Sequence, residues 1–131
     1  MIYRIGWILS YLISRLYVGM RVEGRENIPA KGAFIFAANH ASNMDPFILG
    51  TSFTRPIDFM AKEELFRHPF SRWVYTNFHA HPVRRGDVDF HALKETFRIL
   101  REGRPFLMFP EGTRSRTGEL GEGKPGIGFI A

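Results

Sequence analysis

The sequence predicts an α/β domain with a central, mostly parallel β-sheet flanked by helices. Short apolar runs alternate with helical patterns along the chain, and the apolar runs lead into polar loops. This alternation is typical of a parallel sheet whose functional loops lie at the carboxyl ends of the strands. The chain has 131 residues, enough for one hydrophobic core. We therefore expect one α/β domain over residues 21–131, preceded by a separate helix within residues 1–20.

Residues 1–20 have the pattern of an amphipathic helix. Arg4 and Arg15 lie on a different side from the apolar residues, and the segment contains no acidic residue. The apolar stretch between the two arginines is too short to span a bilayer. We expect the helix to lie in a membrane surface; the alternative is a helix that packs on the protein's own core. The apolar face consists of Ile2, Ile5, Leu9, Leu12 and Leu16.

The first strand and helix of the predicted domain follow a turn-rich connection. Residues 33–38 form a short apolar run, typical of a strand that is buried on both faces. Asp45 and Pro46 then indicate the start of a helix, because Asp suits the N-cap and Pro the first helical position. This helix should reach about residue 52. The strand therefore places His40 just beyond its carboxyl end.

The middle of the chain predicts two further strands with a helical region between them. Residues 59–61 and 80–83 are the expected strands. Residues 63–77 are expected to be helical, with a break near His68 and Pro69, because proline interrupts a helix.

The next helix has both a start signal and a stop signal. Asp87 or Asp89 suits its N-cap, and Gly103 ends it. The last expected strand, residues 106–109, is closed by Pro110 and leads into a long polar loop. One face of the helix is expected to hold Phe90, Leu93, Phe97 and Leu100.

Composition narrows the possible chemistry. Cysteine is absent, which excludes disulfides, thiolate zinc sites and cysteine nucleophiles. The chain carries 18 Lys and Arg against 13 Asp and Glu, and this net charge of +5 favours an anionic partner. The basic residues are spread over both halves of the chain rather than gathered in a tail. Nucleic acid is therefore not an expected partner.

A His–Asp pair after the first strand is the candidate catalytic group. If the carboxylate of Asp45 accepts a hydrogen bond from one imidazole nitrogen of His40, it fixes the tautomer and leaves the other nitrogen as a general base. The simpler alternatives are a helix cap for Asp45 and a turn or core position for His40.

A denser polar cluster follows the last strand. Arg114 suits a bidentate contact with phosphate, and Gly112 allows close approach of the backbone to a ligand. A solvated turn with surface arginines is the alternative. The candidate phosphate-binding residues are Glu111, Gly112, Thr113, Arg114, Arg84 and Arg85.

These clusters carry a family resemblance. Residues 39–45, NHASNMD, are similar to the NHxxxxD signature of the glycerolipid acyltransferases, and residues 109–115 match their FPEGTRS signature. Residues 82–87 fall where that family has an Arg-containing block. The order and separation of the motifs most resemble those of bacterial 1-acyl-sn-glycerol-3-phosphate acyltransferases. The resemblance implies a glycerol-3-phosphate acyltransferase-like fold from Val22 onward.

The resemblance also implies a reaction. A fatty acyl group would pass from acyl-CoA or acyl carrier protein to the sn-2 hydroxyl of lysophosphatidate, which gives phosphatidate for phospholipid biosynthesis. His40 would accept the hydroxyl proton, Asp45 would orient the imidazole, and the 111–114 cluster with Arg84 or Arg85 would hold the phosphate. No metal or cofactor is implied, since the acyl donor is a substrate. The expected location is the cytoplasmic face of the cell membrane.

The chain stops at Ala131, where this family continues with a helix and a strand that carry a fourth motif. We therefore expect a C-terminally truncated fragment or a shortened homologue.

Two other functional classes stay open. One is a catalytically inactive lipid-binding module or inactive fragment, which would not need His40. The other is a metal hydrolase built on His79, His81 and His91.

Overall fold

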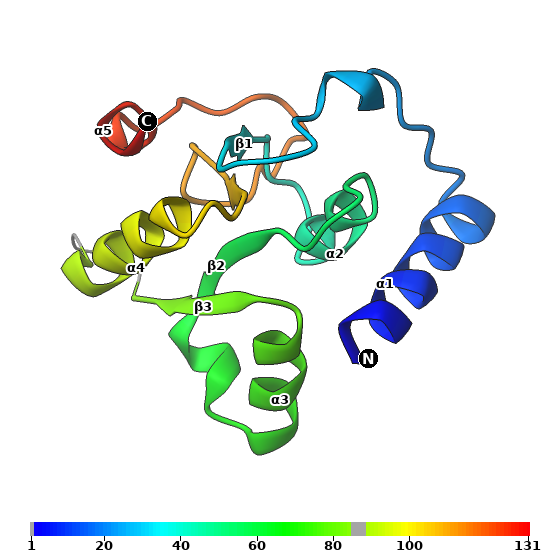
Figure 1. Ribbon diagram of the computed structural model, residues 1–131, viewed down its shortest axis with the longest axis horizontal. Helices are drawn as coiled ribbons and strands as arrows, with labels where there is room; N and C mark the ends of the chain where they lie inside the picture. The colour runs from blue at the N-terminus through cyan, green and yellow to red at the C-terminus, as the bar shows by residue number, and fades with distance from the viewer. Residues whose placement is uncertain (1, 85–88) are drawn as a thin grey trace.

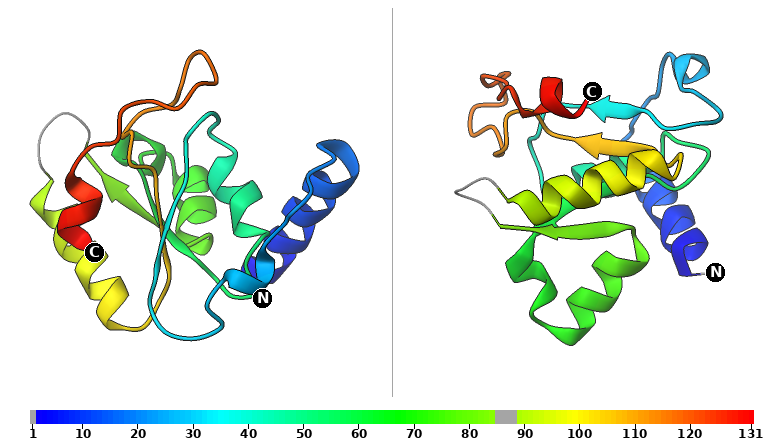
Figure 2. Two further views of the ribbon diagram at one scale, coloured as in Figure 1. Left: turned by 90° about the horizontal axis from the view of Figure 1, so that it is seen from above. Right: turned by 60° about the vertical axis from the view of Figure 1, so that its left-hand side comes forward.

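The computed structural model describes residues 2–84 and 89–131. Within these ranges, four parallel strands form one sheet in the order β1-β4-β2-β3, with helices on both faces (Figures 1 and 2). The predicted fold class is confirmed. The strands are β1 (Ile35–Ala37), β2 (Asp58–Lys62), β3 (Ala80–Val83) and β4 (Phe106–Met108). The helices are α1 (Ile2–Leu12), α2 (Asp45–Gly50), α3 (Pro69–Asn77), α4 (Phe90–Arg101) and α5 (Gly126–Ile130).

The register of the strands separates two apolar surfaces. Leu107 of β4 pairs with Phe36 of β1 and with Phe59 of β2, so these three side chains share one face. This face packs against Phe53 and forms the main core together with residues that follow α2. On the opposite face, Phe106 and residues in alternating register with it line a cavity beneath α4. The left panel of Figure 2 shows α4 and α5 on one side of the sheet, with α2 and α1 on the other.

Most expected elements are present, and several are shorter than the sequence suggests. The strand over 80–83 has the expected bounds, whereas β1 and β4 are trimmed because their regular pairing covers only three residues each. The break near Pro69 is confirmed. A 3₁₀ turn over Glu63–Phe66 ends before it, and His68 caps α3 by accepting a hydrogen bond from the N–H of Phe70 at 3.3 Å.

Helix α4 begins at one of the expected caps and buries its smaller side chains. Asp89 caps the helix, and Asp87 lies outside the described residues. The large apolar residues of α4 are not its buried residues, and Phe90 is 75% exposed. Small and large side chains of α4 both line the cavity, among them Ala92, Leu93 and Thr96, and Phe97 meets Phe129 of α5 edge-on at 6.2 Å. The residues of α4 that are buried are Ala92, Thr96 and Ile99.

Helix α1 packs on the domain through its aromatic and small residues. Tyr3 lies against Phe78, and a Cβ atom added to Gly6 would overlap the ring of Phe78, so the contact requires glycine. The Nε1–H of Trp7 donates to the carbonyl of Gly50 at 3.2 Å. A π-helical turn over residues 13–17 continues the helix.

The aliphatic face of α1 points outward. No described residue buries this face. The helix itself packs on the domain through Tyr3, Gly6 and Trp7, as the alternative expects, and its placement in a membrane surface stays a prediction. No helix in the ranges 2–84 and 89–131 is long and apolar enough to cross a membrane. The exposed apolar residues of α1 and the turn after it are Ile2, Ile5, Ile8, Leu9, Leu12, Ile13, Leu16 and Tyr17.

Candidate active site

The site forms where the loops after β1 and β4 meet. These strands are direct parallel neighbours, so their carboxyl ends lie at the same edge of the sheet. The N–H of Ser115 donates to the carbonyl of His40 at 2.7 Å, which joins the two loops. The imidazole of His40 also stacks on the ring of Phe109, with centroids 4.1 Å apart and planes at 21°. His40 is only 6% exposed and is therefore held on several sides.

His40 and Asp45 form a hydrogen-bonded pair. The distance from Nδ1 of His40 to Oδ2 of Asp45 is 2.8 Å. Because an ionised carboxylate only accepts hydrogen bonds, Nδ1 carries the proton and Nε2 holds the lone pair in the neutral ring. Within the part of the chain that the structure describes, no hydrogen-bond partner engages Nε2. The pair therefore has the geometry of an oriented general base.

The carboxylate of Asp45 also receives two backbone hydrogen bonds. The N–H groups of Ala41 and Ser42 donate to Oδ2 at 2.7 and 2.8 Å. Burial by itself raises the pKa of Asp45, but the hydrogen bonds from Ser42, His40 and Ala41 outweigh it and hold this pKa below the ordinary value. The carboxylate faces the His40 loop and not the first turn of α2, so the helix-cap interpretation is wrong.

Glu111 lies beneath His40 and not at an open phosphate site. Its Oε1 accepts from the backbone N–H of His40 at 3.3 Å, and Oε2 accepts from the N–H of Gly121 at 3.0 Å. The residue is 7% exposed. A Cβ atom at Gly121 would lie 2.6 Å from Oε2, so this close approach requires glycine. Glu111 thereby ties the His40 loop to the long loop after β4.

The other predicted phosphate-binding residues are distributed unevenly. Gly112 and Arg114 line the cavity beside His40, and Gly112 has a left-handed φ of 66° that favours glycine. Thr113 is exposed next to them. The structure does not bring Arg84 to this cavity: its side chain is 74% exposed and lies 3.8 Å from the carboxylate of Asp89. Arg85 lies outside the described residues.

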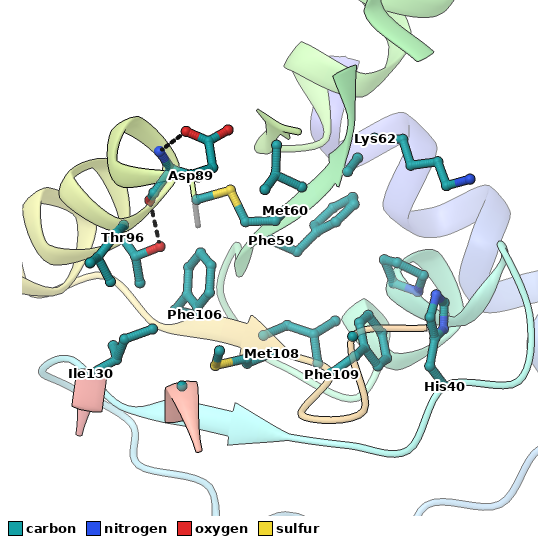
Figure 3. A pocket seen from close by; sticks show the side chains of 18 of the residues that line it. His40, Phe59, Met60, Lys62, Asp89, Thr96, Phe106, Met108, Phe109 and Ile130 are labelled. Atoms are coloured by element: carbon teal, nitrogen blue, oxygen red, sulfur yellow. Dashed lines mark hydrogen bonds between the residues drawn. The ribbon is translucent and has the colours of Figure 1, made fainter. Parts of the chain in front are cut away.

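An apolar cavity of about 800 Å³ begins at His40 and extends between the sheet and α4. Figure 3 shows His40 and Lys62 at one end and Thr96 and Ile130 at the other. Its volume falls within the range of about 300–1,000 Å³ that is usual for small-molecule sites. The apolar side chains that line its middle include Met60, Leu93, Phe106 and Met108.

Lys62 is a site residue that the sequence reasoning missed. It ends β2 and, with Arg114, is one of the two basic residues among the described residues that line the cavity. Its position directly after a predicted strand was the available signal, because neighbouring parallel strands place their carboxyl ends at one edge. The carboxylates of Asp45 and Glu111 also lie next to His40 at this end.

The histidines of the hydrolase alternative lie elsewhere. The Nε2 and Nδ1 atoms of His81 face the carboxylates of Asp58 and Glu95 at 2.7 and 3.2 Å. His79 packs edge-on against the ring of Tyr3. Among residues 2–84 and 89–131, no group of three or more ligating side chains is arranged to hold a metal ion. His79 and His81 thus contact Tyr3 and the two carboxylates in place of one another's ring nitrogens.

Comparison with known proteins gives consistent results. The chain matches the family described as Acyltransferase over residues 19–131. It is 39% identical over 100 residues to the 1-acyl-sn-glycerol-3-phosphate acyltransferase of Borreliella burgdorferi, which covers 75% of this chain and 40% of that protein. It is 33% identical over 105 residues to the enzyme of that name from Bacillus subtilis, with coverage of 79% and 53%. The chain thus spans about half or less of the length of these relatives.

A solved structure has the same fold. The crystal structure of the 1-acyl-sn-glycerophosphate (LPA) acyltransferase PlsC from Thermotoga maritima superimposes with a TM-score of 0.68 and 26% sequence identity. The match covers 98% of this chain and 67% of that protein.

Proposed function

Because this chain belongs to the acyltransferase family, we propose that it transfers a fatty acyl group to the sn-2 hydroxyl of 1-acyl-sn-glycerol 3-phosphate, forming phosphatidate. The acyl donor is a thioester, acyl-CoA or acyl carrier protein. One observation carries the proposal: Nδ1 of His40 lies 2.8 Å from Asp45, while the ring stands at the mouth of an apolar cavity. This arrangement provides a base next to a place for an acyl chain.

The proposed reaction needs one base and no covalent enzyme intermediate. Nε2 of His40 accepts the proton of the sn-2 hydroxyl as its oxygen attacks the thioester carbonyl carbon. The resulting imidazolium is stabilised by the carboxylate of Asp45. When the tetrahedral species collapses, the carbon–sulfur bond breaks, and the leaving thiolate takes up the proton from the imidazolium.

The two cations at the mouth of the cavity suit the two anionic groups of this reaction. Arg114, on the exposed loop beside Gly112, is the proposed contact for the glycerol phosphate. Lys62, which lines the same end of the cavity as His40, is the proposed stabiliser of the oxyanion. Glu111 acts in positioning, since its two oxygens accept from backbone N–H groups. Thr113 stays a candidate for a phosphate contact, as does Arg85.

The apolar cavity is the proposed site for an acyl chain. Its walls between His40 and α5 are formed mainly by aliphatic, aromatic and methionine side chains. Burial of a methylene group in such a wall contributes about 0.8 kcal/mol, so a chain gains affinity with each carbon that it buries. The far end, at Thr96 and Ile130, would then influence which chain lengths fit.

We also propose that the protein works at a membrane surface, on its cytoplasmic face. The outward aliphatic face of α1, with Arg4 and Arg15 on the same helix, suits an interface between acyl chains and anionic headgroups. The acceptor is itself a membrane lipid, so this placement would bring His40 to its substrate.

The test is transfer of labelled acyl groups from acyl-CoA and from acyl carrier protein to lysophosphatidate in vesicles. We expect labelled phosphatidate from at least one donor, and we expect His40→Ala to abolish it. His91→Ala is the matched control, because His91 is an exposed histidine of α4 outside the cavity. No product from the folded chain with either donor would contradict the proposal. If that chain still floats with anionic vesicles, the lipid-binding module becomes the better account.

A further inference from the structure

Helix α2 is anchored at both ends, and only one end belongs to the catalytic pair. Its first residue, Asp45, meets His40. Past its last turn, the guanidinium of Arg25 donates to two backbone carbonyls, from Nε to Ser52 and from a terminal nitrogen to Thr51, both at 2.8 Å. Trp7 donates from Nε1 to the carbonyl of Gly50 at 3.2 Å. Three consecutive carbonyls are thus held by two side chains from the N-terminal segment.

The backbone carbonyls of Ile48 and Leu49, which precede these three, have local hydrogen-bond partners. The carbonyl of Ile48 accepts from the N–H and the hydroxyl of Thr51, and that of Leu49 accepts from the N–H of Ser52. The carbonyl of Gly50 has a long local bond of 3.3 Å from Phe53 as well as the bond from Trp7. The last two carbonyls depend on Arg25. A cation at this end of a helix also interacts favourably with the helix dipole.

The anchors matter because α2 is very short. It has six residues, a length of roughly 9 Å, and so short a helix is not stable by itself. If release of the carboxyl end let the helix tilt by about 20° about its middle, each end would move by about 1.5 Å on this length. A movement of that size at Asp45 would break its 2.8 Å bond to Nδ1 of His40. The orientation of α2 is therefore part of the catalytic geometry.

We propose that Arg25 and Trp7 are positioning residues for the catalytic pair: by holding the carboxyl end of α2, they keep the carboxylate of Asp45 on Nδ1 of His40. The inference rests on the proposed acyl transfer. Neither residue lines the cavity, so their effect is on catalytic orientation and not on substrate contact. Figure 1 shows α1, which carries Trp7, beside α2.

The test compares Arg25→Gln, Arg25→Lys and Trp7→Phe in the full chain. Trp7→Phe keeps an aromatic ring and removes only the N–H donor. Arg55→Gln is the matched control, because Arg55 also bridges two backbone carbonyls, those of Gly32 and Gly103, which lie outside α2. Three measurements are made on each variant: transfer kinetics, which give kcat and KM for lysophosphatidate, urea unfolding, and the downfield proton resonance of the His40 imidazole N–H bonded to a carboxylate.

We expect Arg25→Gln to lower kcat by about ten- to hundredfold, because a displacement near 1 Å has this effect on catalysis. KM should stay unchanged, and the His40 N–H resonance should weaken or move upfield. Arg25→Lys keeps the charge but not the fork, so it should show a smaller loss of the same kind. Arg55→Gln should leave kcat within about twofold and the resonance in place, since it touches neither end of α2.

The proposal is overturned if Arg25→Gln keeps both kcat and the resonance, or if Arg55→Gln lowers kcat as much. If Arg25→Gln does not fold, Trp7→Phe decides: a normal kcat and resonance overturn the proposal, and a several-fold lower kcat with a shifted resonance supports it. If the unsubstituted chain shows no transfer at all, the proposed function fails. The resonance still tests the positioning inference in that case.

Discussion

Glu111→Gln separates two roles for the acidic residue of the FPEGTRS segment. In the structure, the two carboxylate oxygens accept from the backbone N–H groups of His40 and Gly121 at 3.3 and 3.0 Å, and the residue is 7% exposed. A hydrogen bond to a charged group contributes about 1.5–3 kcal/mol. Glutamine keeps one acceptor and turns an NH₂ group toward the other N–H donor. We therefore expect the free energy of unfolding to fall by about 2–3 kcal/mol.

This loss corresponds to a change of about 30- to 150-fold in the folding equilibrium. Urea titration followed by circular dichroism measures it, and Glu119→Gln is the control, because Glu119 is an exposed acid of the same loop. Transfer kinetics supply the second readout: kcat should fall because the His40 loop loses its support, while KM for lysophosphatidate changes little. Unchanged stability with a raised KM would refute the structural reasoning. Glu111 would then contact the substrate phosphate.

Three further predictions concern the stability contributed by Asp45, Gly6 and Asp58. The hydrogen bonds that lower the pKa of Asp45 stabilise the fold fully above its unfolded value of 3.8, and this stabilisation is lost as the pH falls through the lower folded value. Asp45→Asn should therefore lower the free energy of unfolding near neutral pH and progressively less in acid, as measured by urea titration. Gly6→Ala should lower the melting temperature by forcing α1 away from Phe78, whereas Gly50→Ala, with open space around its Cβ, should not. Asp58→Ala should lower the free energy of unfolding by about 3 kcal/mol, since Asp58 is 1% exposed and lies 2.9 Å from Arg104; a loss below 1 kcal/mol in urea titration would contradict this.

The amino-acid sequence by itself determined the class of fold and the candidate catalytic pair, His40 and Asp45. Apolar runs, capping residues and prolines act on their immediate neighbours, so they predicted the parallel sheet, the break at Pro69 and an Asp cap at residue 87 or 89. His40 and Asp45 are five residues apart on one loop and helix start, and this short spacing already limits how they can meet. The motifs around them identified the family.

Only the tertiary structure decided which distant segments meet. Glu111 is 71 residues from His40 in the sequence, and nothing local shows that its carboxylate points at the backbone of that loop. The same holds for Arg25, whose two acceptor carbonyls lie 26 and 27 residues away. The large side chains of α4 were expected on one face, but periodicity does not show what that face packs against.

Helix α1 shows this distinction most directly. Its sequence predicted an apolar face and a polar side, but periodicity has no information about which side meets the domain. The structure turns Gly6 and Trp7 inward and leaves Leu9 and Leu16 exposed, because the close contact with Phe78 admits only a residue without a side chain. Short-range chemistry thus determines the elements of this protein, while close packing between remote segments determines which of their faces are available for function.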